Sequence, residues 1–253
     1  PQKRHERIFP YLGLLKCAEC SASITAEHKI KKSGKEYTYY RCTKKKGVCS
    51  QAYVREEILT DQLAKFIGSV SLSPALADLA LQELAKDREE NSLISETHKQ
   101  NIKSEIVVCK NMLDKLLDAH LESTISVEEY KEKKNKVLNQ KIEHEEKLAK
   151  IDQQGNRSLE LTKNLVLRAK QAHFVATERN HSDLSDFFKT IGSNPLLNRR
   201  EVQATPRGAW RILADFDPDW RAGGGELPDF MQRSVLRYLL NKVRTHFDEN
   251  PTE

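Results

Sequence analysis

The first third of the chain changes from an alternating to a helical pattern of hydrophobic and polar positions. Residues 24–31 and 35–41 are rich in β-type residues, and the Ser-Gly pair at 33–34 between them is a turn signal, so we predict a two-stranded hairpin. From Val54 onward, apolar residues recur on one helical face: Ile58, Leu59, Leu63, Phe66 and Ile67. The segment 14–75 is therefore predicted to be a β-ribbon followed by a helix.

Two long apolar stripes at helical spacing follow. Ser73 and Pro74 form a helix start signal. The first stripe contains Leu76, Leu79, Leu84, Leu93, Ile102, Ile106, Cys109, Leu113 and Leu116. After a break, Ser126 and Glu129 make a capping box for a second helix. Its stripe contains Tyr130, Val137, Leu138, Ile142, Leu148 and Ile151. Two such helices joined by a short polar turn predict a projecting antiparallel coiled-coil hairpin over 76–152.

The two ends of the chain have weaker patterns. Residues 1–13 are basic without clear periodicity and predict a linker. Towards the C-terminus the pattern predicts a helix at 158–190, loops at 194–228 with a flexible glycine patch at 223–225, and a closing helix at 230–247. We expect 153–253 to be a helical return that completes the ribbon domain.

Composition and charge refine this picture. The 253 residues are 38% hydrophobic and 31% charged, which suits long exposed helices. The net charge is only +5, but 29–46 hold eight basic residues against one acid, Glu36, whereas 76–152 hold 13 basic and 17 acidic residues. No apolar run approaches the roughly 20 residues of a membrane span, and no signal peptide opens the chain. Because Pro1 stands where methionine is expected, we predict a fragment of a longer protein.

Four of the five cysteines have the spacing of a metal site. The pairs Cys17-x2-Cys20 and Cys42-x6-Cys49 flank the predicted hairpin, which returns the chain so that four thiolates can form a tetrahedron. This predicts one structural Zn²⁺, although the second pair is wider than usual. Unrelated buried cysteines or two disulfides are the alternatives, and His28 is a candidate substitute ligand. The predicted fold class is thus mainly α with a small zinc-bound β-ribbon; Cys109 is expected to be a core residue.

A concentration of cations on a small metal-stapled ribbon is typical of nucleic-acid binding, since cations bind phosphates and release counterions. The candidate DNA-binding residues are Lys29, Lys31, Lys32, Lys35, Tyr39, Arg41, Lys44, Lys45 and Lys46. Tyr40 is an alternative to Tyr39 for packing beside the DNA backbone, and Arg41 can reach a guanine edge. In the alternative interpretation, the lysines only make a small domain soluble.

Several stretches together resemble one known family. LGLLKCAECSASITAEHK and YTYYRCTKKKGVCSQAYVREEIL resemble the zinc β-ribbon of large serine recombinases (serine integrases). LLDAHLESTISVEEYKEKKNKV resembles the tip of the coiled-coil arm in that domain, and FMQRSVLRYLLNKVRTHF resembles its closing helix. The resemblance covers most of 8–247 and is poorest at 194–228.

The resemblance implies a function in site-specific integration and excision of mobile DNA. It implies that Cys17, Cys20, Cys42 and Cys49 bind zinc, that the ribbon binds double-stranded attachment-site DNA, and that coiled-coil arms of two subunits contact each other. A directionality factor is a further implied partner, and the location is the cytoplasm of a bacterium, on DNA. The family's nucleophilic serine lies in another domain, so this chain alone is expected to cut nothing.

Apolar residues at the predicted hairpin tip, Leu121, Ile125 and Val127, are candidates for that contact between subunits. Alternatively, Leu121 and Ile125 fold back to cap the hairpin seam. A different class of function is a protein-interaction module in which the ribbon is only a structural cap. An independent hydrolase is disfavoured because no nucleophile and base converge in the sequence.

Overall fold

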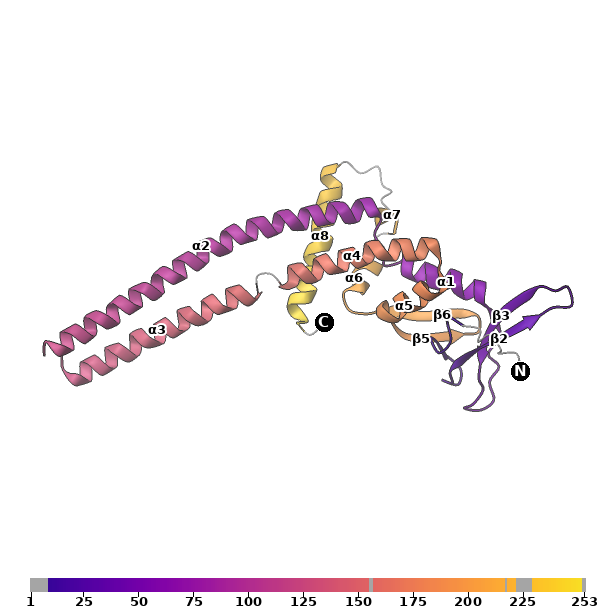
Figure 1. Ribbon diagram of the computed structural model, residues 1–253, viewed down its shortest axis with the longest axis horizontal. Helices are drawn as coiled ribbons and strands as arrows, with labels where there is room; N and C mark the ends of the chain where they lie inside the picture. Colours follow the sequence, from indigo (N-terminus) through magenta and orange to yellow (C-terminus); the bar gives the residue numbers. More distant parts are fainter. Residues whose placement is uncertain (1–8, 155–156, 217, 222–228, 252–253) are drawn as a thin grey trace, which may run out of the picture. The chain divides into compact units, whose positions relative to one another are not determined.

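The computed structural model describes residues 9–154, 157–216, 218–221 and 229–251. The protein is mainly helical with a small β-ribbon, as predicted (Figure 1). It divides into two compact units: unit 1 comprises Pro1–Leu81 and Asn164–Glu253, and unit 2 comprises Gln82–Lys163. The greater part of the predicted linker, with His5, and the glycine patch at 223–225 lie outside the described residues.

The β-ribbon of unit 1 is an antiparallel sheet in the order β2-β3-β4. Its strands and the short strand before them are β1 (Lys16–Cys17), β2 (Ile24–Ile30), β3 (Glu36–Cys42) and β4 (Val54–Arg55). Ile24 lies opposite Cys42, and Gly34 takes a positive φ of 77° in the turn, so the predicted hairpin is confirmed. Helix α1 (Glu56–Gly68) follows, and of the predicted apolar face it buries Leu59, Leu63 and Ile67, whereas Ile58 is exposed.

A second sheet lies where the sequence predicted loops. Strands β5 (Gly192–Asn198) and β6 (Glu201–Pro206) form a hairpin, and β5 pairs in parallel with β1. Helices α6 (Trp210–Ala214) and α7 (Pro218–Arg221) follow. The loop-rich interpretation of 194–228 was therefore wrong for its described residues. One strand partner of β5, the strand β1, is far away in sequence, so no local pattern indicates that pairing.

The predicted helix at 158–190 is two helices, α4 (Arg157–Glu178) and α5 (His181–Ile191). Arg179 takes a left-handed φ of 55°, and Asn180 then caps α5 by accepting from the Ser182 N–H at 2.9 Å. The closing helix is confirmed as α8 (Asp229–Glu249). It buries one face, formed by Leu236, Leu239, Leu240, Val243 and Phe247.

Tyr11 belongs to the core of unit 1, although the sequence placed it in a linker. Its side chain is 0% exposed, and its hydroxyl lies 2.9 Å from the Thr60 hydroxyl in α1. Its backbone N–H donates to the Tyr40 hydroxyl of β3 at 3.3 Å. Burial raises the pKa of Tyr11 to about 12. The packed unit therefore begins before Gly13.

Unit 2 is a helical hairpin formed by α2 (Pro74–Leu121) from Gln82 onward and by α3 (Val127–Gln154), with the first residues of α4. The helices run antiparallel: His144 Nδ1 lies 3.1 Å from Glu105 Oε2, and the His120 and Tyr130 rings stack at 4.6 Å. Ile106 and Cys109 are buried, as the first stripe predicted. Leu93, Leu138 and Ile142 are exposed instead, so these three positions were wrong. Regular coiled-coil packing remains a prediction.

Candidate metal centre and nucleic-acid interface

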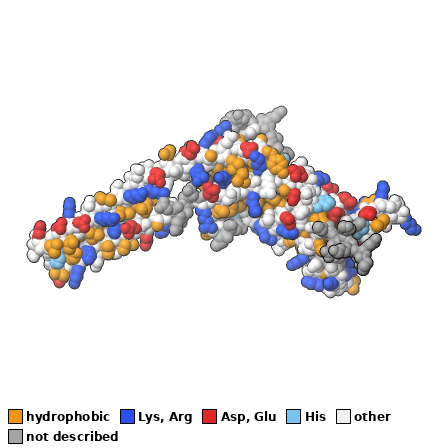
Figure 2. Space-filling model, viewed as in Figure 1, with side chains coloured by type: hydrophobic (Ala, Val, Ile, Leu, Met, Phe, Trp, Pro, Cys, Tyr) orange, Lys and Arg blue, Asp and Glu red, His pale blue; other side chains and the backbone are white. Residues whose placement is uncertain are grey.

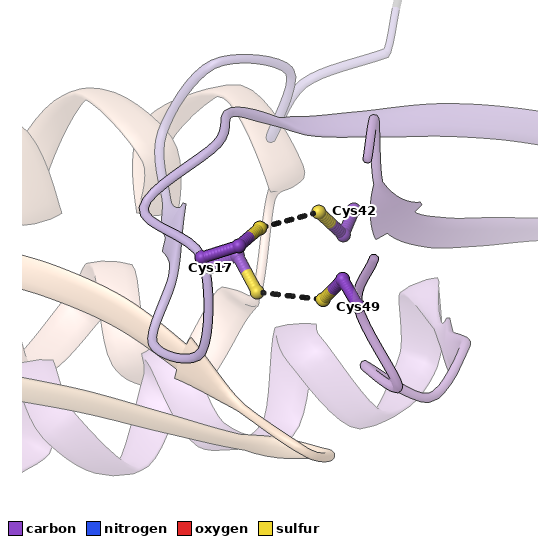
Figure 3. Close-up of side chains that lie close together, drawn as sticks. Cys17, Cys42 and Cys49 are labelled. Atoms are coloured by element: carbon purple, nitrogen blue, oxygen red, sulfur yellow. Dashed lines mark hydrogen bonds between the residues drawn. The ribbon is translucent and has the colours of Figure 1, made fainter. Parts of the chain in front are cut away.

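Four cysteine sulfurs converge at one end of the β-ribbon. Cys17 ends β1, Cys20 follows in a tight turn, Cys42 ends β3, and Cys49 closes the next loop. The Cys17 and Cys49 sulfurs are 3.5 Å apart, those of Cys20 and Cys42 are 3.4 Å apart, and all four lie within 4.8 Å of one another (Figure 3). A tetrahedral zinc ion with bonds of about 2.3 Å separates its sulfurs by about 3.8 Å. The cluster therefore fits a tetrahedral metal ion.

The sulfur positions exclude disulfide bonds within the cluster. All five cysteines are free, and sulfur separations of 3.4 and 3.5 Å exceed the ~2.05 Å of a disulfide. Backbone N–H groups of Lys44 and Gln51 donate to the sulfurs of Cys42 and Cys49 at 3.2 and 3.4 Å. A hydrogen bond from the Ala22 backbone lowers the pKa of Cys20, whereas burial raises that of Cys42. A bound cation would offset the mutual repulsion of four thiolates.

The other histidine and cysteine candidates lie elsewhere. His28 Nε2 is 3.2 Å from Glu36 Oε2 and does not join the sulfur cluster. Cys109 is buried in α2, as expected of a core residue.

One face of the β2-β3-β4 sheet carries tyrosines and cations in alternation. Glu27 lies opposite Tyr39 and Lys29 opposite Tyr37, so these side chains share a face. The face consists of Tyr37, Tyr39, Tyr53, Glu27, Lys29, Lys31, Arg41 and Arg55, and we call it the tyrosine face. Here Lys29 lies over the Tyr53 ring at 5.0 Å and Arg55 over the Tyr37 ring at 4.7 Å. Such cation–π contacts hold the cations in place without neutralising them.

Four members of this face, Tyr37, Glu27, Tyr53 and Arg55, are not among the DNA-binding residues predicted from the sequence, and the last two had a local signal. They lie two residues apart just after the second cysteine pair, and this alternation is a signal that was available in the sequence.

Tyr40 attaches the opposite face of the sheet to the rest of unit 1. This side chain is 0% exposed, and its hydroxyl donates to Glu56 Oε2 at 3.0 Å. Burial raises the pKa of Tyr40. Tyr40 therefore cannot lie beside a DNA backbone, and that alternative was wrong. Tyr39, its neighbour, lies on the tyrosine face.

The predicted DNA-binding residues do not form one cluster. Lys32 and Lys35 belong to the β2–β3 turn, whereas Lys44, Lys45 and Lys46 belong to the loop between Cys42 and Cys49. The seven residues of β3 separate these groups by about 24 Å at ~3.4 Å per residue. Lys29, Lys31, Tyr39 and Arg41 lie between them on the tyrosine face. In Figure 2, blue side chains mark the free end of the β2–β3 ribbon.

Glu27 is the acid of the tyrosine face. Its carboxylate accepts from Arg41 Nε at 2.9 Å and lies 3.3 Å from Lys29 Nζ. The hydrogen bond from Arg41 lowers the pKa of Glu27. Arg41 is therefore partly neutralised in the free protein.

The β5–β6 hairpin is attached directly to the metal centre. The Ala18 N–H, between Cys17 and Cys20, donates to the Leu197 carbonyl at 3.0 Å. The Gln51 side chain, two residues after Cys49, binds the backbone of Arg199 at the β5–β6 turn. Nothing in the sequence indicated that this hairpin belongs to the site.

The tip of the helical hairpin is a well-capped turn with exposed apolar side chains. The predicted capping box is present: the Glu129 N–H donates to Ser126 Oγ at 3.2 Å, and the Ser126 N–H donates to Glu129 Oε2 at 3.1 Å. Leu121 is 72% exposed and Val127 46%, whereas Ile125 is half-buried. The tip thus folds Ile125 partly back but leaves Leu121 in solvent.

Comparison with known proteins identifies the ribbon. Residues 10–67, which contain all four clustered cysteines, match the family model described as "Recombinase zinc beta ribbon domain". Over these residues the chain is similar to the recombinase zinc β-ribbon family. The match confirms, for this segment, the resemblance drawn from the sequence.

Other comparisons add less about the recombinase zinc ribbon. A solved structure titled "Crystal Structure of a LSR-DNA Complex" matches at 13% identity with a TM-score of 0.37, over 80% of this chain and 59% of the other. This chain thus spans about three fifths of the protein it matches. No curated protein matches the chain. Among the described residues, no helix combines the length and apolarity needed to cross a membrane.

The sulfur geometry predicts that each thiol is needed for metal binding. We expect Cys42→Ser to lose Zn²⁺ binding and to unfold the β-ribbon locally, because the sheet has few buried apolar residues of its own. The helical hairpin should stay folded. Zinc content by elemental analysis and hydrogen exchange of β2 and β3 measure these effects. Cys109→Ser is the control, and full zinc occupancy in Cys42→Ser would contradict the assignment.

Proposed function

We propose that this chain is the DNA-binding and synapsis-controlling part of a site-specific large serine recombinase. The observation that supports this most is the tyrosine face, which lies on a sheet of the recombinase zinc β-ribbon family and ends at the sulfur cluster. One structural zinc ion bound by Cys17, Cys20, Cys42 and Cys49 would supply the cross-link that fixes the ribbon. The chain's own N–H groups hold the thiolates in position.

In this proposal the ribbon binds attachment-site DNA along its length. The turn lysines, the tyrosine face and the loop with Lys44, Lys45 and Lys46 form a cationic strip about 24 Å long. That length corresponds to roughly seven base-pair steps at about 3.4 Å each. The Tyr53 and Tyr37 rings hold Lys29 and Arg55 on this face, where phosphates would meet them.

The helical hairpin would contact the hairpin of another DNA-bound subunit. Exposed Leu121 and Val127 at its tip provide apolar surface for such a contact, and a small contact suits a switch that forms and breaks. We propose a directionality factor as a further partner and a bacterial or phage-encoded protein that works on DNA in the cytoplasm. Catalysis would belong to the domain of the parent recombinase that carries the serine.

A protein-interaction module without specific DNA binding is the second candidate. The observation that favours it is the number of exposed apolar side chains on the helical hairpin, seen in orange in Figure 2. They are Leu93, Ile94, Val107, Val108, Met112, Leu117, Leu121, Val127, Leu138 and Ile142. Salt-dependent binding to a short duplex distinguishes the two candidates, because only the first requires it.

The loop lysines provide the first test of DNA binding. We expect replacement of Lys44, Lys45 and Lys46 by alanine to weaken duplex binding and to reduce the slope of log affinity against log salt by about 0.9 for each phosphate that the loop no longer neutralises. Fluorescence anisotropy over a salt series measures both. Alanine at the exposed Lys131, Lys133 and Lys134 of α3 removes the same charge as a control. An unchanged slope in the loop variant would exclude this loop from the interface.

Glu27 provides a second test, in which DNA affinity should rise instead of fall. Glu27→Gln removes the carboxylate that partly neutralises Arg41 and repels phosphate, so duplex affinity should rise roughly fivefold. Glu36→Gln is the matched control, since Glu36 lies on the opposite face of the sheet. Equal or lower affinity for Glu27→Gln would show that the tyrosine face does not meet DNA.

The hairpin tip is tested in the full-length recombinase. Ile125→Asp should leave helix content and single-site DNA binding intact but abolish pairing of two DNA-bound subunits, because it places a charge in the proposed contact. Circular dichroism and a gel assay of paired sites measure these properties. Ser123→Asp adds a charge at the same turn without removing apolar surface. Normal pairing in Ile125→Asp would leave the tip as a structural turn only.

A further inference from the structure

The turn between β5 and β6 is held by two glutamine side chains. Arg199 and Arg200 form this turn, closed by Asn198 opposite Glu201. Gln51 Oε1 accepts from the Arg199 N–H at 3.0 Å, and Gln51 Nε2 donates to the Arg199 carbonyl. Gln62 Nε2 donates to the Arg200 carbonyl at 2.8 Å. The backbone of both arginines is therefore fixed by side chains from the first third of the chain.

This attachment connects the turn to both halves of the metal centre. Gln51 is only 6% exposed, and its own N–H donates to the Cys49 sulfur. On the other side, β5 pairs with β1 at Cys17. In Figure 3 the orange β5–β6 ribbon passes beside Cys17 and Cys49. The turn thus has a fixed position relative to the sulfur cluster.

Arg199 occupies a backbone conformation that favours glycine. Its φ is +56°, in the left-handed region, where a side chain costs free energy that glycine avoids. Lys44 has the same φ, and its N–H donates to the Cys42 sulfur. Cationic side chains are therefore placed on both sides of the metal centre where glycine would fit without strain. Such strain persists only where the surrounding structure holds it, as Gln51 does here.

The two guanidinium groups are available for a ligand. Arg199 and Arg200 are exposed, and within the described part of the chain neither guanidinium makes a hydrogen bond or an ion pair. By contrast Arg179, which also has a left-handed φ of 55°, donates to Asp61 Oδ1 at 2.7 Å. Arg199 instead has the positive φ that a two-residue hairpin turn needs at its first central position, and its guanidinium, unlike that of Arg179, has no partner among the described residues.

We infer that Arg199 and Arg200 form a second phosphate-binding element of the DNA interface, presented beside the metal centre by Gln51. The inference rests on the proposed DNA-binding function and adds a contact from a distant part of the chain. Guanidinium forks match phosphate oxygens in a bidentate geometry, so a fixed turn with two arginines suits the backbone of a duplex. Gln51 acts as the positioning residue.

The substitution Arg199→Gly tests whether the Arg199 side chain binds DNA or only supports the fold. Glycine accepts the left-handed backbone, so zinc content and the melting temperature of the 253-residue chain should be unchanged. Binding to a short mixed-sequence duplex should weaken, and the salt slope should fall by about 0.9. Adding Arg200→Ala should lower the slope by a similar amount again. Fluorescence anisotropy over a salt series provides the measurement.

Arg179→Gly is the matched control, since it makes the same change at nearly the same φ. It should lose the ion pair with Asp61 and leave DNA binding unchanged. Gln51→Ala should keep both arginines yet weaken duplex binding as Arg199→Gly does, because the turn is no longer held.

The outcomes separate this inference from the proposed function. If the Arg199→Gly, Arg200→Ala variant binds the duplex with the wild-type slope while the Lys44, Lys45 and Lys46 variant loses slope, the turn does not touch DNA and the proposed function stands. If the wild-type chain shows no salt-dependent duplex binding, the proposed function fails and the inference fails with it.

Discussion

The convergence of four sulfurs at the end of a small sheet is the constraint on which the ribbon depends. The β2-β3-β4 sheet buries only one face, where Tyr40, Ile24 and Val54 pack. A sheet of that size has too little apolar surface to order itself. Backbone N–H groups directed at Cys42 and Cys49 prepare the thiolates for a cation. A metal cross-link would then hold the strands without further apolar side chains.

This arrangement leaves the outer face of the sheet free to carry charge. Because Tyr40 points inward and its neighbour Tyr39 outward, one strand both anchors the sheet and presents tyrosine to solvent. Tyrosine rings support the cations, and Glu27 restrains two of them. The sheet tolerates the mutual repulsion of these cations because the metal centre, and not the outer face, would hold its strands together. The cationic outer face of the sheet therefore depends on the metal centre at its end.

The helical hairpin differs from the ribbon in how its apolar side chains divide between burial and exposure. Its buried apolar residues, among those described, are Leu84, Ile106, Cys109 and Leu159, and many other apolar side chains face solvent. The capping box at Ser126 and Glu129 and the stacked His120 and Tyr130 fix the turn locally. Local capping therefore defines the tip independently of apolar burial, and apolar surface remains for a partner. Such a unit is suited to transient contacts.

Local sequence signals predicted the elements that depend on residues close together in the chain. Cysteine spacing predicted the metal cluster, the Ser-Gly pair predicted the β2–β3 turn, and the capping box predicted the start of α3. Tertiary structure alone decided the rest. Alternation shows that Tyr39 and Tyr40 face opposite sides, but only packing against Tyr11 and Glu56 decides which one is buried.

The same reason explains the missed strands and the missed arginines. The β5–β6 hairpin joins a sheet of unit 1 because β5 pairs with β1, and Gln51 binds the Arg199 turn from 148 residues away. A local pattern reports the preference of a segment in isolation. It contains no record of the distant backbone groups that satisfy its hydrogen bonds, and those groups are supplied only when the chain folds.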